Sequence, residues 1–180
     1  MRRLRTLLPS LLLVGGVAAC SAPTVEAPRL HHDAALDFYR GAVRDGTMPL
    51  VVRGNPYAAD DRAVWQRAAK VLAERGPPPR PEYTDQAGNG TRFVVVLGGD
   101  TAERAPAAAC RGTAQGGAAR DGIPALAVLC NGRRPLVSAR GNLPADAGPR
   151  STPFARLLDA LMGRLTRHPI DDQTALRIRF

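Results

Sequence analysis

The order of apolar and polar positions predicts a helix and then a strand just after residue 32. Over 33–45, apolar residues recur at the spacing of one helix face, and Gly46 follows as a helix stop. The segment 48–53 (MPLVVR) is short and rich in β-branched residues, which predicts a buried strand that ends in turn-forming residues. The positions expected on the inner face of this helix are Leu36, Tyr39 and Val43.

A second helix is predicted to run from Asp60 and Asp61 to Arg75. The two carboxylates suit a helix start, and Gly76 with the prolines after it suits a helix end. A buried stripe is expected along one side, with Trp65 at its edge. Its members are Val64, Ala68, Val71 and Leu72.

A second strand is predicted over 91–97 (TRFVVVL). Its continuous apolar run is typical of a strand buried on both faces. The intervening residues 77–91 are proline, glycine and polar residues, which predict a surface loop. Because strand, helix and strand follow one another here, a βαβ unit with parallel strands 48–53 and 91–97 is expected.

A β-hairpin is predicted further along, at 125–130 and 133–139. Asn131-Gly132 separates the two runs, and this dipeptide favours a type I′ turn between antiparallel strands. Proline cannot donate to a strand ladder, so prolines here are expected at strand starts or on an edge. The two prolines concerned are Pro124 and Pro135.

The strongest amphipathic pattern lies near the C-terminus. Ser151 or Thr152 is expected to cap this helix, which should end before His168-Pro169 and cover the sheet with its apolar face. Beyond it, apolar and basic residues alternate over 174–180, which predicts a short edge strand. The apolar face consists of Phe154, Leu157, Leu158, Leu161, Met162 and Leu165.

Together these elements predict one globular α/β (α+β) domain over 31–180. The expected architecture is a two-layer sandwich: a small mixed sheet with one βαβ unit, one antiparallel hairpin and about three helices. About 160 residues are enough for a single hydrophobic core.

The first nineteen residues have the layout of a secretory signal peptide. Three arginines precede an apolar run from Leu7 to Ala19, which ends in small residues. A membrane-spanning helix needs roughly 20 apolar residues. This run is shorter and contains Pro9 and two glycines, so export rather than a membrane span is expected.

The end of this segment, VAAC at 17–20, resembles the lipobox of bacterial lipoproteins. The resemblance implies that residues 1–19 are removed and that Cys20 is acylated on its thiol and usually on its amino terminus, which anchors the chain stably. Residues 20–30, with two prolines and no periodicity, are then expected to be a lipidated tether. By analogy within that family, Ser21 favours the outer membrane facing the periplasm, with the outer face of the inner membrane as the alternative.

The net charge of +9 falls to +6 without the signal segment, and all basic residues except Lys70 are arginines. These arginines are scattered, so a compositional origin is favoured over a patch for anionic lipids or polymers. Nucleic acid is not an expected partner, because the chain is exported and carries no basic stripe or RNA-binding motif.

With Cys20 lipidated, Cys110 and Cys130 remain, and a pair of cysteines in an exported protein is expected to form a disulfide. The predicted role is to fix the flexible segment 111–120 (RGTAQGGAAR). Redox activity and zinc binding are disfavoured, because the Cys-x-x-Cys motif and further ligands are missing.

Motifs for enzymatic chemistry are few. The sequence lacks the motifs of serine hydrolases, zinc proteases and phosphate-binding loops, and no metal or cofactor is expected. Gly98-Gly99-Asp100 follows a predicted buried strand, where α/β proteins place ligand loops, so it is a possible ligand loop, with a plain turn as the alternative.

Two groups of polar residues add weaker possibilities. The segment 31–33 (HHD) has cation-binding residue types, but it lies beside the tether and is expected to be a solvated helix start. A triad of Ser138 or Ser151 with His168 and an aspartate stays open, because such triads are recognised only in space.

Three functions follow from these observations. The first expectation is a non-catalytic domain that binds a protein or polymer partner in the periplasm. The alternatives are an envelope hydrolase with its site around Gly98–Asp100 and the Cys110 loop, and a carrier of an apolar ligand in a cavity under the helices.

Overall fold

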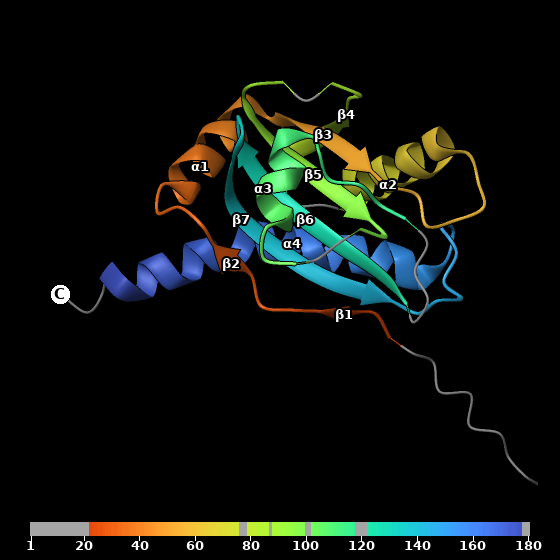
Figure 1. The fold of residues 1–180 in the computed structure, drawn as a ribbon. Coiled ribbons are helices and arrows are strands. Elements are labelled where there is room, and N and C mark those ends of the chain that lie inside the picture. The colour runs from red at the N-terminus through yellow and green to blue at the C-terminus, as the bar shows by residue number, and fades with distance from the viewer. Residues whose placement is uncertain (1–21, 76–78, 87, 100–101, 118–121, 178–180) are drawn as a thin grey trace, which may run out of the picture.

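The computed structural model of the chain describes residues 22–75, 79–86, 88–99, 102–117 and 122–177. Over these residues it contains four helices and one open, seven-stranded mixed sheet (Figure 1). The elements are β1 (Thr24–Val25), β2 (Arg29–Leu30), α1 (Ala35–Asp45), β3 (Thr47–Arg53), α2 (Asp61–Arg75), β4 (Arg80–Tyr83), β5 (Thr91–Leu97), α3 (Ala105–Arg111), β6 (Ile123–Asn131), β7 (Arg134–Leu143) and α4 (Thr152–Arg177).

The strands follow the order β1-β7-β6-β5-β3-β4, and β2 pairs with β7 as well. β3 is parallel to both β4 and β5, and the other pairs are antiparallel. The parallel pairing expected for the βαβ unit is therefore confirmed. The expected loop 77–91 is wrong in part, because it contains β4, whose sequence RPEY shows no clean alternation of apolar and polar residues.

Helices cover both faces of the sheet. α1, α2 and α4 pack on the first face, and α3 lies on the opposite, second face (Figure 1). Strand β5 supplies apolar residues to both: Phe93 and Val95 to the first face, Val94 and Val96 to the second. The mixed α/β class is confirmed, with one more helix than expected and a partial third layer formed by α3.

Helix α3 lies in a stretch expected to be a loop. Its sequence, APAAACR, is mostly alanine and has no apolar–polar periodicity from which a helix could be read. Cys110 sits near its end and forms a disulfide with Cys130 on β6, as expected, with an S–S distance of 1.99 Å. The disulfide therefore attaches a short helix directly to the sheet.

The hairpin between β6 and β7 is confirmed, but its turn differs from the expected type. Asn131 pairs with Arg134, so Gly132 and Arg133 are the central residues. Gly132 has a φ of +56°, and no non-glycine residue in the described part of the chain has a positive φ. A type I′ turn needs a positive φ at both central residues, so a single glycine at the first position instead fits a type II′ turn.

Helix α1 turns a partly different face to the core than expected, and the Leu36 side chain lies outside the described part. Val43, expected inside, is 37% exposed, whereas Ala35 and Ala42 are buried and Tyr39 packs against the core. Small alanines let the helix lie close to the sheet, which the apolar spacing alone did not reveal. Gly46 ends the helix with a φ of +81°, as expected.

Helix α4 is longer than expected. Ser151 accepts a hydrogen bond from the Phe154 amide at 3.3 Å, which confirms the start, but the helix continues through His168-Pro169 to Arg177. The predicted helix end before His168 is therefore wrong. The predicted edge strand over 174–180 is also wrong for residues 174–177, which are helical, and residues 178–180 lie outside the described residues. Alternation over a few residues also fits a helix end, and β1 and β2 already occupy the free edge of β7.

Replacing both cysteines of the disulfide should weaken the fold. The bridge closes a loop with a sequence separation of 20 residues, and the chain-entropy relation gives about 3 kcal/mol for such a loop. The Cys110→Ser, Cys130→Ser double variant should therefore lose about that free energy of unfolding in a urea titration. Reduced wild-type protein is the matched control, and an unchanged midpoint in both samples would contradict a stabilising disulfide.

Candidate functional site

The described part of the expected tether, residues 22–30, pairs with the sheet instead of running free. Residues 22–31, here called the N-terminal strap, run antiparallel along the edge of β7. Thr24 pairs with Asn142 at one end, and the His31 amide donates to the Leu136 carbonyl at 2.8 Å at the other. The strap therefore forms the outer edge of the sheet through β1 and β2.

A register shift in the strap decides which side chains face the second face of the sheet. The pairing with β7 shifts by one residue between Val25 and Arg29, around Ala27-Pro28. Arg29 then pairs with Ser138. Since paired residues share a face, Arg29 joins Ser138 on the side covered by α3.

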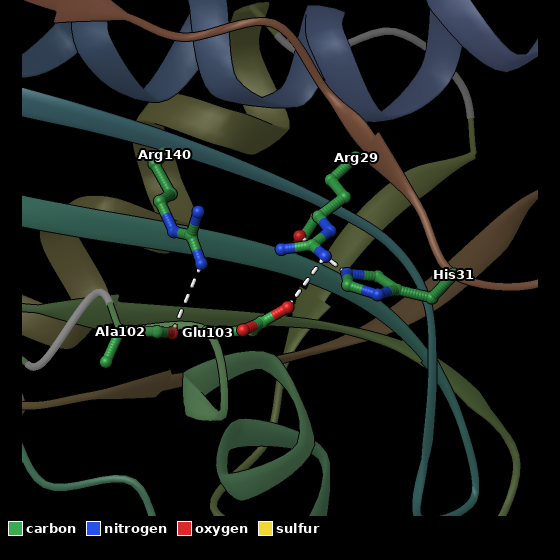
Figure 2. Close-up of polar contacts among 6 residues, drawn as sticks. Arg29, His31, Ala102, Glu103 and Arg140 are labelled. Atoms are coloured by element: carbon green, nitrogen blue, oxygen red, sulfur yellow. Dashed lines mark hydrogen bonds and ion pairs between the residues drawn. The ribbon is translucent and has the colours of Figure 1, made fainter.

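Four polar side chains meet there in what we call the strap cluster: Arg29, His31, Ser138 and Arg140. The His31 Nε2 atom lies 2.8 Å from the Ser138 Oγ atom. Arg29 forms an ion pair of 2.9 Å with Glu103, and Arg140 donates to the Ala102 carbonyl at 3.1 Å. Figure 2 shows both arginines reaching toward the turn that precedes α3. The cluster thus connects the strap, β7 and that turn.

The strap cluster disfavours the charged form of His31. Burial of the ring lowers the pKa of His31 below its ordinary value of 6.5, and the nearby charges of Arg29 and Arg140 lower it further. A neutral ring can accept a hydrogen bond from the Ser138 hydroxyl or donate one to it, depending on its tautomer. The interpretation of 31–33 as a solvated helix start is therefore wrong for His31, which is partly buried beside β7.

The Ser138–His31 pair has the residue types of a nucleophile and its base, but not the access. Ser138 is only 1% exposed, so a substrate could not reach its hydroxyl. The groups that perturb His31 are two arginines rather than the carboxylate that orients a catalytic histidine. The His31–Ser138 hydrogen bond therefore has a structural role, which is to hold the strap on β7. The arrangement does not suit nucleophilic catalysis.

Of the triad considered from the sequence, the structure describes the side chains of Ser138 and Ser151 but not that of His168. His168 lies on α4, which packs on the first face of the sheet, whereas Ser138 lies on the second. Ser151 caps α4 through its hydroxyl. Ser138 instead contacts the ring of His31, which lies 107 positions away in sequence.

The possible ligand loop Gly98-Gly99-Asp100 is described only in its two glycines. The Gly98 amide donates to the Pro124 carbonyl, and the Gly98 carbonyl accepts from the Gly117 amide, both at 2.7 Å. Gly98 has a φ of +69°, and a Cβ atom there would lie 2.1 Å from the Gly117 oxygen. The close packing of two backbone segments explains why residue 98 is a glycine. Asp100 lies outside the described residues, so ligand binding by this loop stays a prediction.

A buried arginine that sequence reasoning missed lies on the same face. Arg92 on β5 is 2% exposed and donates to the Cys110 carbonyl at 2.6 Å and to the carbonyls of Gly88 and Gly90. Burial lowers the pKa of its guanidinium from the ordinary value. All these acceptors are backbone carbonyls, so Arg92 holds α3 and the β4–β5 loop against the sheet.

Surface depressions lined by described residues lie beside several of these elements. They measure about 280 Å³ beside α3, about 310 Å³ beside α1 and about 450 Å³ between the strap and the end of β7. None of them is lined by His31 or Ser138. Within the described residues, no group of three or more His, Cys, Asp or Glu side chains is placed to hold a metal ion.

Comparison with known proteins gives no relative: no protein family, no curated protein and no solved structure matches the chain. Among the described residues, no helix is both long and apolar enough to cross a bilayer. The class that fold and site define is therefore a mixed α/β domain whose N-terminal strap forms one sheet edge.

The strap cluster predicts a measurable property of His31. Because its folded-state pKa is lowered, His31 should titrate below pH 6.5 in an NMR pH series. The sign follows from linkage: the stability due to neutral His31 is complete above the unfolded pKa and is lost as the pH falls through the folded one. Arg140→Gln should raise the pKa of His31, and His32→Gln should leave it unchanged. A His31 ring that titrates at or above 6.5 would contradict this electrostatic description.

Proposed function

We propose that this chain is a lipoprotein of the cell envelope, anchored by acyl chains on Cys20, whose small α/β domain binds a protein or polymer partner and catalyses no reaction. The favoured location is the outer membrane, facing the periplasm. The proposal is carried by the exposed apolar side chains at the end of the domain that points away from the anchor.

The anchor end of the domain follows from the direction of the strap. Three residues separate Cys20 from Thr24, the first residue paired with β7. Since an extended chain covers at most ~3.6 Å per residue, Thr24 lies within about 14 Å of the lipidated residue. The Leu143 end of β7 would therefore lie next to the membrane.

The opposite end carries α1 and faces the periplasm in this orientation. The large hydrophobic side chains exposed in the described part of the chain are Leu30, Phe38 and Val43, at 46%, 36% and 37%. All three lie on the far half of the strap or on α1. Phe38 also lines the depression of about 310 Å³ beside α1. Exposed apolar side chains beside a depression are typical of surfaces that bind partners.

The two other functions have less support. A hydrolase needs a base within reach of an accessible nucleophile, and the Ser138 hydroxyl beside His31 is buried. A carrier of an apolar ligand needs an enclosed apolar cavity. The first face under α1, α2 and α4 is instead filled by buried side chains such as Phe93, Phe154 and Leu158.

Replacing Cys20 by alanine tests the anchor. The variant should leave the membrane fraction or remain as unprocessed precursor, because the acylated thiol is absent. Membrane fractionation and intact mass of the wild type and the variant provide the measurement. Normal processing with unchanged partitioning would contradict lipidation at Cys20.

A photo-crosslinking residue at position 38 tests the partner surface. Replacing Phe38 by a photoreactive phenylalanine in intact cells should give a crosslinked product of defined mass, because this exposed side chain lines the proposed binding surface. The same residue in place of Lys70, which is exposed on α2, is the matched control. Equal products from both positions, or no product from position 38, would contradict the proposed surface.

A further inference from the structure

We infer that the N-terminal strap is a releasable spacer. When docked on β7 it holds the domain against the membrane, and when released by acidification it lets the domain move outward. The release itself is a property of the folded chain, whereas its consequence for membrane distance rests on the proposed lipidation of Cys20.

The backbone pairing of the strap is short compared with the rest of the sheet. β1 and β2 contribute two residues each, separated by the register shift around Ala27-Pro28. On its other side, β7 pairs with β6 over nearly its full length. Local opening begins where buried contacts are few, and the strap is mostly exposed.

The polar side-chain contacts of the strap lie at its far end, whereas at its near end Val25 packs against the core of the first face and is only partly buried. The ion pair between Arg29 and Glu103 is solvent-exposed, with side-chain exposures of 52% and 78%. Exposed pairs of this kind contribute little to stability. Of the two polar contacts, the His31–Ser138 hydrogen bond is the partly buried one, so the state of His31 has a larger influence on docking than the ion pair.

Acid should weaken the docking of the strap. The charged groups described near His31 include Arg29 on the strap, Arg140 on β7 and, paired with Arg29, Glu103 on the turn before α3. Glu103 is already paired with Arg29, which leaves the positive charge of Arg140 without a carboxylate among these three groups. A protonated His31 would add a second such positive charge. Docking is therefore strongest above pH 6.5 and weakens as the pH falls below it.

Release would change the reach of the anchor substantially. With the strap docked, the chain between Cys20 and the sheet spans four residues, up to Thr24. With the strap released, it spans fourteen residues, up to Ala34 just before α1. At ~3.6 Å per residue, the limit rises from about 14 Å to about 50 Å. A domain held at the bilayer could then extend well into the periplasm.

Hydrogen exchange on the mature protein tests the release. After correction for intrinsic rates, the amides of Glu26 and His31 should exchange at least about tenfold faster than amides of the β6–β7 ladder. This ratio should rise several-fold between pH ~7.5 and ~5.5. His31→Gln should abolish the rise, because the glutamine amide can still bond Ser138 but does not titrate. His32→Gln, on the neighbouring exposed ring, should retain it.

A charge swap tests the ion pair independently. Arg29→Glu should speed exchange of the strap amides by placing two carboxylates together, and adding Glu103→Arg should restore the wild-type rate. Two results would overturn the inference. One is strap amides that exchange only at the rate of the β6–β7 ladder at both pH values, and the other is a pH dependence that persists in His31→Gln.

Fluorescence energy transfer from the domain to a dyed bilayer then tests the membrane consequence with the lipidated protein. The separation should grow on acidification in the wild type and stay constant in His31→Gln. If the strap amides of the wild type respond to pH but the distance between domain and bilayer does not change, the spacer role is overturned. Failure of lipidation would instead be seen as a protein that does not bind the bilayer, while its strap exchange is unaffected.

Discussion

The second face of the sheet depends on one short helix being held in place. Strands β5 and β6 present apolar residues such as Val94 and Val128 on that side, and α3, only seven residues long, covers them. A helix of this length does not form stably by itself. The Cys110–Cys130 disulfide and the hydrogen bond from Arg92 to the Cys110 carbonyl attach its C-terminal end to two adjacent strands.

The same attachment extends to the strap cluster. The turn that precedes α3 supplies the Glu103 carboxylate for Arg29 and the Ala102 carbonyl for Arg140. A helix fixed at one end therefore positions the groups that meet the strap at its other end. The sheet edge, the cluster and the covering of the second face form one connected set of contacts.

Local patterns in the sequence predict the elements that have an apolar face of their own. The run at β5, the hairpin at Gly132 and the start of α4 at Ser151 are confirmed because each carries both a hydrophobic pattern and a turn or cap residue. Three features lacked such a pattern. They are α3, which is nearly all alanine, β4, which is too short, and the extension of α4 beyond Pro169, where proline usually ends a helix.

The candidate site was less predictable for a different reason. The disulfide could be predicted by counting cysteines in a chain expected to be exported. The meeting of His31 with Ser138 depends on a strand pairing between residues more than one hundred positions apart, and the segment that carries His31 has no strand pattern. The burial of Arg92 could not be predicted either, because an arginine near the start of an apolar strand is normally expected to be exposed.

The position of the strap has a consequence for the order in which the domain folds. Its partner β7 lies more than one hundred residues further along the chain, whereas β7 pairs with its neighbour β6 through a two-residue turn. Closing a long loop costs more chain entropy than closing a hairpin. We therefore expect the strap to dock after the hairpin has formed, so that the N-terminal segment, synthesised first, is among the last parts of the domain to reach its native place.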